Sequence, residues 1–223
     1  PEQLFAEYAK SIGIGGIAMA GIVGIVKSWN IIRGAVGLAV KEMGGKKKKS
    51  LPLRTERDLS MKMIAFGIIF TLLLVVLFFY LDVMHGNIVH TAVAILVVAG
   101  ISFLFTTVAA NAIAIVGTNP VSGMTLMTLI LASVIMVAVG LRGTSGMVAA
   151  LIMGGVVCTA LSMAGGFITD LKIGYWIGTT PAKQESWKFL GTLVSAATVG
   201  GVIMILDKTY GFSSETLVAP QAN

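Results

Sequence analysis

Charged residues are scarce in this sequence. Only 12% of its 223 residues are Asp, Glu, Lys or Arg, whereas a soluble domain carries about 25%. Apolar residues take their place, making up 56% of the chain and raising its mean hydropathy to +0.93. Several apolar runs reach the roughly 20 residues that a helix needs to cross a bilayer. The composition therefore excludes an ordinary soluble domain and predicts an integral membrane protein.

Cysteine and histidine are also nearly absent. The one cysteine, Cys158, excludes an internal disulfide, and its apolar neighbours in the sequence predict a small buried side chain rather than a reactive thiol. The two histidines have no cysteine or glutamate beside them that would complete a metal shell. The sequence contains no nucleophile elbow, phosphate loop or HExxH motif. We therefore expect no enzymatic activity, no bound metal and no cofactor.

An initiator methionine is missing, and the polar opening, residues 1–10, shows no evident signal peptide. We therefore expect the chain to be an excerpt of a longer polypeptide. Its net charge of +6 does not indicate nucleic-acid binding, because half of the 16 Lys and Arg residues lie between Lys41 and Lys62, beside a membrane span. That cluster is typical of a positive-inside anchor.

The apolar runs predict an all-α, polytopic membrane bundle with about six spans. A mixed stretch, residues 28–40, is expected to form a further helix along the membrane surface. The positive-inside rule places both Lys-rich loops in the cytoplasm, and the four spans between them give the even number of crossings that this requires. The predicted spans are about 11–26, 63–81, 88–110, 120–141, 147–167 and 189–206, and the predicted cytoplasmic loops are about 41–62 and 170–188.

One polar stretch without charge interrupts the apolar runs. Residues 111–125 read N-A-I-A-I-V-G-T-N-P-V-S-G-M-T. A loop in water normally carries charge, and a helix in lipid normally avoids Asn-Pro. A polar, uncharged break at membrane depth is tolerated where it is buried in protein or lines a wet cavity, which is where transporters place their substrate sites. We therefore predict a broken helix near residues 117–123.

This break is the candidate substrate-binding site. Asn119 suits an N-cap and Pro120 suits a first helical turn, so a helix is expected to begin inside the membrane. Its free N–H groups and partial positive charge favour a carboxylate or another anionic group. Gly123 lies in the same opening, and Ser122 and Thr125 add hydroxyls to it. The alternative interpretation is a break satisfied by a neighbouring helix.

A second candidate follows the fifth predicted span. Asp170 and Lys172 place opposite charges two residues apart at the membrane interface, where they would pair in one state of a carrier and part in another. With Tyr175 they form the predicted gate; the alternative is an ordinary interfacial loop with a belt aromatic. A second G-T-x-P, residues 178–181, again puts a hydroxyl before a proline, but four residues are too few to establish an internal repeat.

Three titratable residues, Asp82, His85 and His90, gather at the predicted outer end of the bundle. Histidine changes its charge near neutral pH, so a proton-entry role is one interpretation of this cluster. The other is that these side chains simply face solvent at the ends of spans. The apolar runs themselves contain no Asp or Glu that would carry a proton.

Three stretches are similar to motifs of the oligopeptide transporter (OPT) superfamily, which includes the yellow stripe-like metal-chelate carriers. Residues 119–125 match its NPVSGMT motif. Residues 170–184 match its DLKxGY…GxxPxxQ motif, with Ile173 where the family commonly has Thr. Residues 219–222 resemble an APQA element, and residues 4–28 fit a Gly-rich span ending in Lys-Ser. The resemblance covers the chain almost end to end.

The resemblance implies an internal or C-terminal portion of a secondary active symporter, driven by protons, for short peptides or amino-acid-derived metal chelates. The implied partners are this substrate, protons, membrane lipid and the rest of the polypeptide. A passive channel and a non-transporting scaffold subunit remain the alternatives, although a scaffold helix has no reason to be interrupted at residues 117–123. The short loops favour a bacterial inner membrane.

Overall fold

The structure, a computed structural model, describes residues 29–43, 53–84, 86–117 and 121–211, together with isolated helical positions between 12 and 26. The chain forms two compact units: the first comprises Pro1–Leu51 and Leu59–Ile173, and the second comprises Pro52–Asp58 and Gly174–Asn223. Most of the first predicted span, residues 11–26, lies outside the described residues. Each unit is described separately below.

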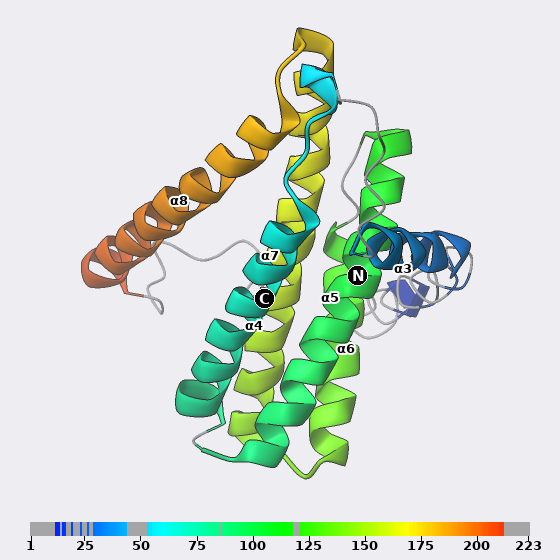
Figure 1. The fold of residues 1–223 in the computed structure, drawn as a ribbon. Helices are drawn as coiled ribbons and strands as arrows, with labels where there is room; N and C mark the ends of the chain where they lie inside the picture. Colours follow the sequence, from blue (N-terminus) through cyan, green and yellow to red (C-terminus); the bar gives the residue numbers. More distant parts are fainter. Residues whose placement is uncertain are drawn as a thin grey trace. The chain divides into compact units, whose positions relative to one another are not determined.

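The described residues are almost entirely helical and contain no strand, which confirms the all-α class. The long apolar runs dictate this result, because a chain in lipid must satisfy its backbone hydrogen bonds within each segment. The helices are α3 (Trp29–Met43), the short 3₁₀ turn η2 (Arg54–Glu56), α4 (Met61–Phe78), the π-helical η3 (Phe79–Val83), α5 (Ile88–Val116), α6 (Val121–Ala138), α7 (Gly143–Ile177) and α8 (Pro181–Tyr210). Figure 1 shows their arrangement.

In the described part of the chain, four stretches are long and apolar enough to cross a membrane: Arg54–Val83, Ile88–Ile115, Gly143–Ile177 and Pro181–Tyr210. They contain the spans predicted at 63–81, 88–110, 147–167 and 189–206. A shorter apolar helix, Met124–Ala138 within α6, occupies the span predicted at 120–141. The fold is therefore that of a polytopic helical membrane protein. The number of crossings and the side of each loop stay predictions.

The expectation of a loop at residues 170–188 is wrong in its local structure. Helix α7 continues to Ile177 and α8 begins at Pro181, so only three residues lie between them. The polar residues here include Lys, Gln and Glu, which are good helix formers, so polarity alone did not mark a loop. Gly178, with φ 76°, ends α7, and Pro181 supplies the preset first turn of α8.

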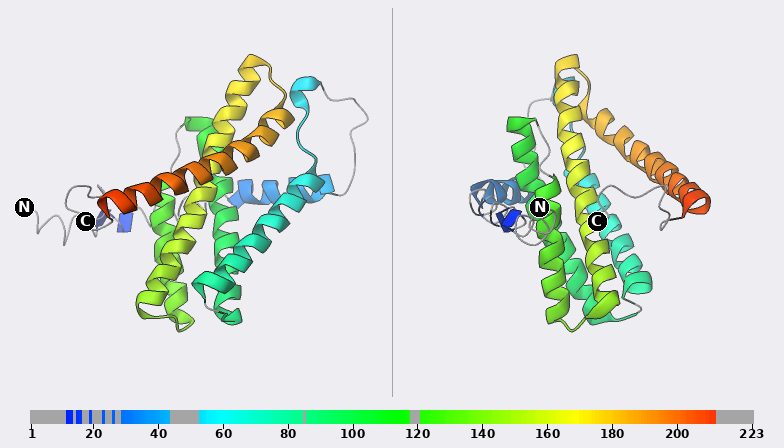
Figure 2. Two further views of the ribbon diagram at one scale, coloured as in Figure 1. Left: turned by 90° about the vertical axis from the view of Figure 1, so that its left-hand side faces the viewer. Right: turned by 180° about the vertical axis from the view of Figure 1, so that it is seen from behind.

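The core of the first unit lies where α5, α6 and α7 meet, with η3 at one end. The largest fully buried side chains include Phe79 of η3, Met136 of α6 and Met153 of α7. At Gly154 of α7 an added Cβ would collide with the Leu129 side chain of α6, so glycine permits this close approach. The views of Figures 1 and 2 agree that α5 and α6 run side by side.

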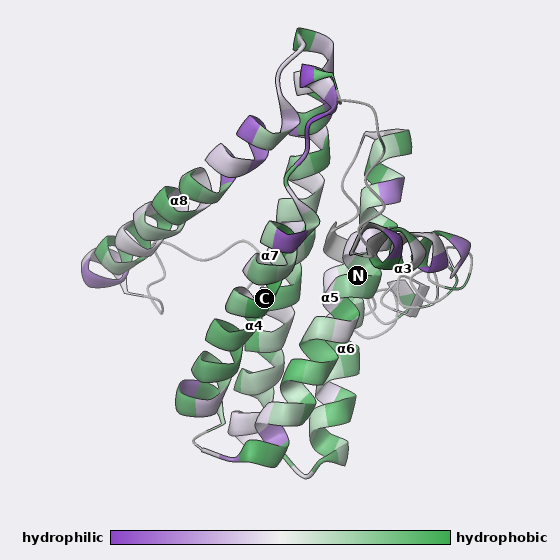
Figure 3. Cartoon of the chain, viewed as in Figure 1, coloured by the Kyte–Doolittle hydropathy of each residue, from purple (hydrophilic) through white to green (hydrophobic). Residues whose placement is uncertain are grey.

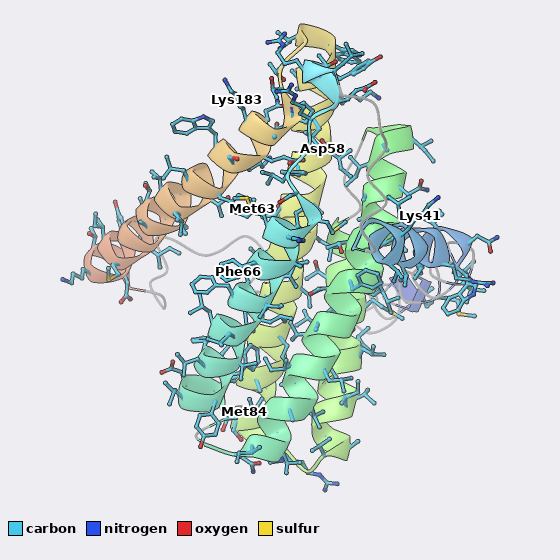
Figure 4. All side chains as sticks on the ribbon, in the orientation of Figure 1. Lys41, Asp58, Met63, Phe66, Met84 and Lys183 are labelled. Carbon is cyan, nitrogen blue, oxygen red and sulfur yellow. The ribbon has the colours of Figure 1, made fainter. Side chains whose placement is uncertain are left out.

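Two helices keep most of their apolar surface exposed. In Arg54–Val83, which contains α4, only 6% of the most apolar 18-residue stretch is buried. In α8, none of the corresponding stretch is buried. Figure 3 shows that α4, α5 and α6 are hydrophobic along most of their length. On α4, Phe66 is 72% exposed and points outward in Figure 4. Helices that are apolar all round require an apolar environment, which agrees with a membrane location.

Candidate functional site

The break between α5 and α6 begins at Gly117. Its φ of 80° is left-handed, and its N–H donates to the Ile113 carbonyl at 2.8 Å. A left-handed residue after the last turn is a common way to end a helix, and glycine adopts it without a steric penalty. Helix α6 begins at Val121, four residues later. The predicted broken helix near 117–123 is therefore present, whereas Asn119 and Pro120 lie outside the described residues.

The first turns of α6 carry the other predicted site residues. Ser122 and Gly123 lie in the opening turn, and Thr125 follows on the next turn, where it is half-buried. The first N–H groups of any α-helix lack partners within the helix, so this end offers donors to an anionic group. The structure thus places Ser122, Gly123 and Thr125 at one helix start, as the sequence predicted.

Thr128 is a neighbouring polar residue that the sequence analysis did not select. It is only 1% exposed, and its hydroxyl donates to the Met124 carbonyl at 2.9 Å. The signal that could have found it is the spacing S-x-x-T-x-x-T, which puts hydroxyls three residues apart near one face of a helix. Because its proton is used within the helix, Thr128 offers a neighbour only its oxygen lone pairs.

The second motif, residues 170–184, comprises the end of α7, the three-residue turn and the start of α8. The Thr179 N–H donates to the Gly174 carbonyl at 2.9 Å, which closes the end of α7. The Thr179 hydroxyl also donates to Gln184 Oε1 of α8 at 3.2 Å. Thr180 is the N-cap of α8 but makes no side-chain capping bond. Its carbonyl instead accepts the Lys183 and Gln184 N–H groups.

A side chain at position 174 would disturb the same turn. An added Cβ would collide with Gln184 Oε1 and would lie 2.5 Å from Thr179 Oγ1. The Gln184 amide therefore lies directly against the last turn of α7. The G-Y…G-T-x-P-x-x-Q pattern thus has a structural explanation, which is a packed helix–helix turn.

The predicted gate residues lie near the end of α7. Asp170, Lys172 and Tyr175 all belong to this helix, and all three side chains are exposed. Residues two apart on a helix do not face each other. The Asp170 and Lys172 side chains therefore leave α7 in different directions, and their pairing in one state of a carrier stays a prediction.

The predicted proton-entry residues are only partly brought together. Asp82 is exposed on η3, and His85 lies outside the described residues. His90 is half-buried in the first turn of α5, whose N-cap, Asn87, accepts the Val89 and His90 N–H groups. The His90 ring instead faces the segment after α6, with Nε2 3.3 Å from the Val139 carbonyl. Among the described residues no three His, Cys, Asp or Glu side chains group as a metal would require.

A bundle of membrane-length helices, interrupted by an uncharged polar break, defines a polytopic helical membrane protein with a candidate solute site. The chain belongs to the OPT oligopeptide transporter family, whose model matches residues 1–223. A Haemophilus influenzae protein named "Putative oligopeptide transporter" is 28% identical over 237 residues, an alignment that covers 91% of this chain and 37% of that protein. The chain therefore spans little more than a third of this relative's length. No solved structure matches it.

Proposed function

We propose that this chain forms part of a secondary active transporter that moves short oligopeptides or peptide-like metal chelates together with protons. The observation that carries this proposal is the break at Gly117, where α5 ends in a left-handed residue and α6 begins four residues later without an intervening charge. Family membership supports the same reading. A polar, uncharged interruption between two apolar helices is tolerated at membrane depth where it lines a cavity.

The substrate site in this proposal is the start of α6. The free N–H groups of its first turn would receive the carboxylate of a peptide or chelate. Asn119 and Pro120 would open the helix, and Ser122, Gly123 and Thr125 would line the opening. The absence of a lysine or arginine from residues 111–125 leaves the anion held by dipoles alone. Weak binding of that kind suits a carrier, because the substrate must also leave.

The gate in this proposal is the exposed end of α7. Asp170, Lys172 and Tyr175 project in different directions from consecutive turns. Each of the three side chains would therefore contact a different neighbour when the carrier changes state. They would not close against one another.

Proton coupling requires a titratable group, and the apolar runs of this chain contain no Asp or Glu. We propose that the coupling group is either one of Asp82, His85 and His90 or a residue of the remaining polypeptide. His90 is the strongest of the three, because its ring is half-buried and bridges the start of α5 to the end of α6. We propose a bacterial inner membrane as the location, as the short loops favour.

The test is uptake into proteoliposomes that contain the full-length protein, with and without an inward proton gradient. Labelled di- to hexapeptides and a ferric or nickel chelate are compared side by side. Accumulation above equilibrium that depends on the gradient is the expected result. Equilibration without accumulation would replace the symporter with a passive facilitator, and no flux of any label would contradict transport.

The site assignment has its own variant. Asn119→Ala is expected to cut uptake while membrane levels stay unchanged. Asn30→Ala, an exposed position on α3, makes the same chemical change away from the break and is expected to leave uptake as it was. Equal uptake by both variants would contradict the placement of the substrate at residues 117–125.

A further inference from the structure

A short segment before α4 makes two hydrogen bonds to the turn between α7 and α8. We call this segment, residues 53–58, the strap. The Arg54 guanidinium donates to the Gly178 carbonyl at 2.9 Å, although the two residues are 124 positions apart in the sequence. The Arg57 main-chain carbonyl accepts the Ala182 N–H at 2.9 Å. All of these residues belong to the second compact unit.

The strap satisfies one group from each of two helix ends. Gly178 follows the last residue of α7, and Ala182 is the second residue of α8. Carbonyls at the end of a helix and N–H groups at its start have no partner within the helix. A cationic side chain at a helix C-terminus also interacts favourably with the helix dipole. The strap therefore joins two adjacent helix ends at the points where each needs a partner.

The turn also has hydrogen bonds of its own. The bonds from Thr179 to the Gly174 carbonyl and to Gln184 lie within the turn itself, and the glycine at position 174 makes room for them. The side chains of Arg54 and Arg57 are exposed, and no residue of η2 is buried. The arrangement thus divides into a packed helix–helix turn and a segment fastened to its surface by two bonds.

We propose that the strap is a conformational latch on the α7–α8 turn, closed in one state of the carrier and released in another. The inference rests on the proposed function, because only a protein that changes state needs such a device. The strap runs through residues 59 and 60 into α4, a membrane-length helix. Its release would free the strap from the α7–α8 turn while leaving the bonds within the turn in place. A few exposed hydrogen bonds suit this role, because they hold two elements together and break at low cost.

The first arm of the test measures hydrogen exchange in the full-length protein in lipid nanodiscs. Arg54→Ala removes the bond to Gly178 and is expected to speed exchange of the Ala182 amide, which the strap holds, by roughly three- to tenfold, while the Thr179 amide, bonded within the turn, keeps its protection. Arg57→Ala is the matched control, because it removes the same charge from the same segment but keeps the main-chain carbonyl that holds Ala182. Equal exchange in the two variants would overturn the latch.

The second arm locks the strap covalently. A hydrogen bond between two main chains brings their Cα atoms within roughly the 4.4–6.8 Å that a disulfide spans. The pair Arg57→Cys with Ala182→Cys, in a full-length background whose other cysteines are replaced by serine, is therefore expected to cross-link on oxidation. We expect the oxidised protein to lose proton-driven uptake of labelled trialanine and to regain it after reduction. Failure to cross-link, or full uptake while cross-linked, would overturn the proposal.

The two arms separate this inference from the proposed function. If the cysteine-replaced parent moves no label, proton-driven peptide transport is contradicted, while the exchange arm still decides whether the strap fastens the turn. If the parent transports and the locked protein transports equally, transport stands and the latch is rejected.

Discussion

His90 and Val139 lie 49 positions apart in the sequence, yet the His90 ring nitrogen Nε2 is 3.3 Å from the Val139 carbonyl oxygen. His90 belongs to the first turn of α5, and Val139 follows the last residue of α6. The carbonyl can only accept, so a hydrogen bond at this contact requires a proton on Nε2 of the ring. One side chain therefore joins the start of one helix to the end of the next.

Replacement of His90 tests this link. His90→Phe removes the donor and is expected to lower the free energy of unfolding by roughly 1 kcal/mol, the usual worth of one hydrogen bond. His90→Gln keeps an N–H donor and is expected to lose less. Thermal unfolding of the full-length protein in detergent measures both. Identical unfolding temperatures for the two variants would show that the bond contributes nothing.

Alanine in place of two glycines of α7 is expected to affect stability differently. Gly174→Ala pushes the Gln184 amide from its bond with Thr179, so we expect a loss of about 1 kcal/mol that offsets the helix propensity gained there and leaves the unfolding free energy nearly unchanged. At Gly155 an added Cβ meets nothing within 4 Å, so Gly155→Ala gains helix propensity of up to about 1 kcal/mol. Unfolding temperatures of the two variants provide the measurement. A Gly174→Ala variant stabilised as much as Gly155→Ala would contradict the packed turn.

The close approach of α6 and α7 at Gly154 predicts a rescue. Gly154→Val forces its side chain against Leu129 and is expected to cost about 1–3 kcal/mol, as overpacking usually does. A second change, Leu129→Ala, removes the obstructing atoms and should restore part of this loss. A double-mutant cycle from thermal unfolding measures the coupling. Strictly additive effects would show that the two side chains do not compete for space.

Replacement of Thr128 tests whether its hydroxyl contributes to transport without contributing much to stability. Thr128→Val preserves the shape of the side chain and is expected to cost less than about 1 kcal/mol, because the hydroxyl bonds only to its own helix. We expect uptake to fall, since the site near Thr125 would lose an acceptor oxygen. Thr198→Val is the control, because Thr198 makes the same type of bond to Val194 on the exposed α8. Equal uptake by both variants would remove Thr128 from the site.

The helices and the break could be predicted from the sequence because both are local. Apolar runs of membrane length predict helices, and an uncharged G-T-N-P predicts the end of one helix and the start of another. The link from Arg54 to Gly178 could not be predicted, because nothing in either segment specifies a partner 124 positions away. Local polarity also misled at residues 170–188, where Lys, Gln and Glu form helix ends rather than a loop.

The second motif shows a different limit. Its residues were selected for their charges, and Asp170 and Lys172 were expected to pair. The structure explains instead the residues that carry no charge: Gly174, Thr179 and Gln184 pack together to form the turn. A sequence pattern records which residues occur together, but it does not separate those that build the site from those that act in it.

The π-helical segment Phe79–Val83 accommodates one more residue than an α-helical turn of the same rise. The first residue of the segment, Phe79, is fully buried, and Met84, which follows the segment, is nearly so. Tyr80 and Leu81 between them are exposed. The additional residue of this π-helical turn therefore lies in the part of the segment whose side chains are exposed. We therefore expect that deletion of one residue between Phe79 and Met84 would shorten this stretch to an α-helical turn that still presents both side chains to the core.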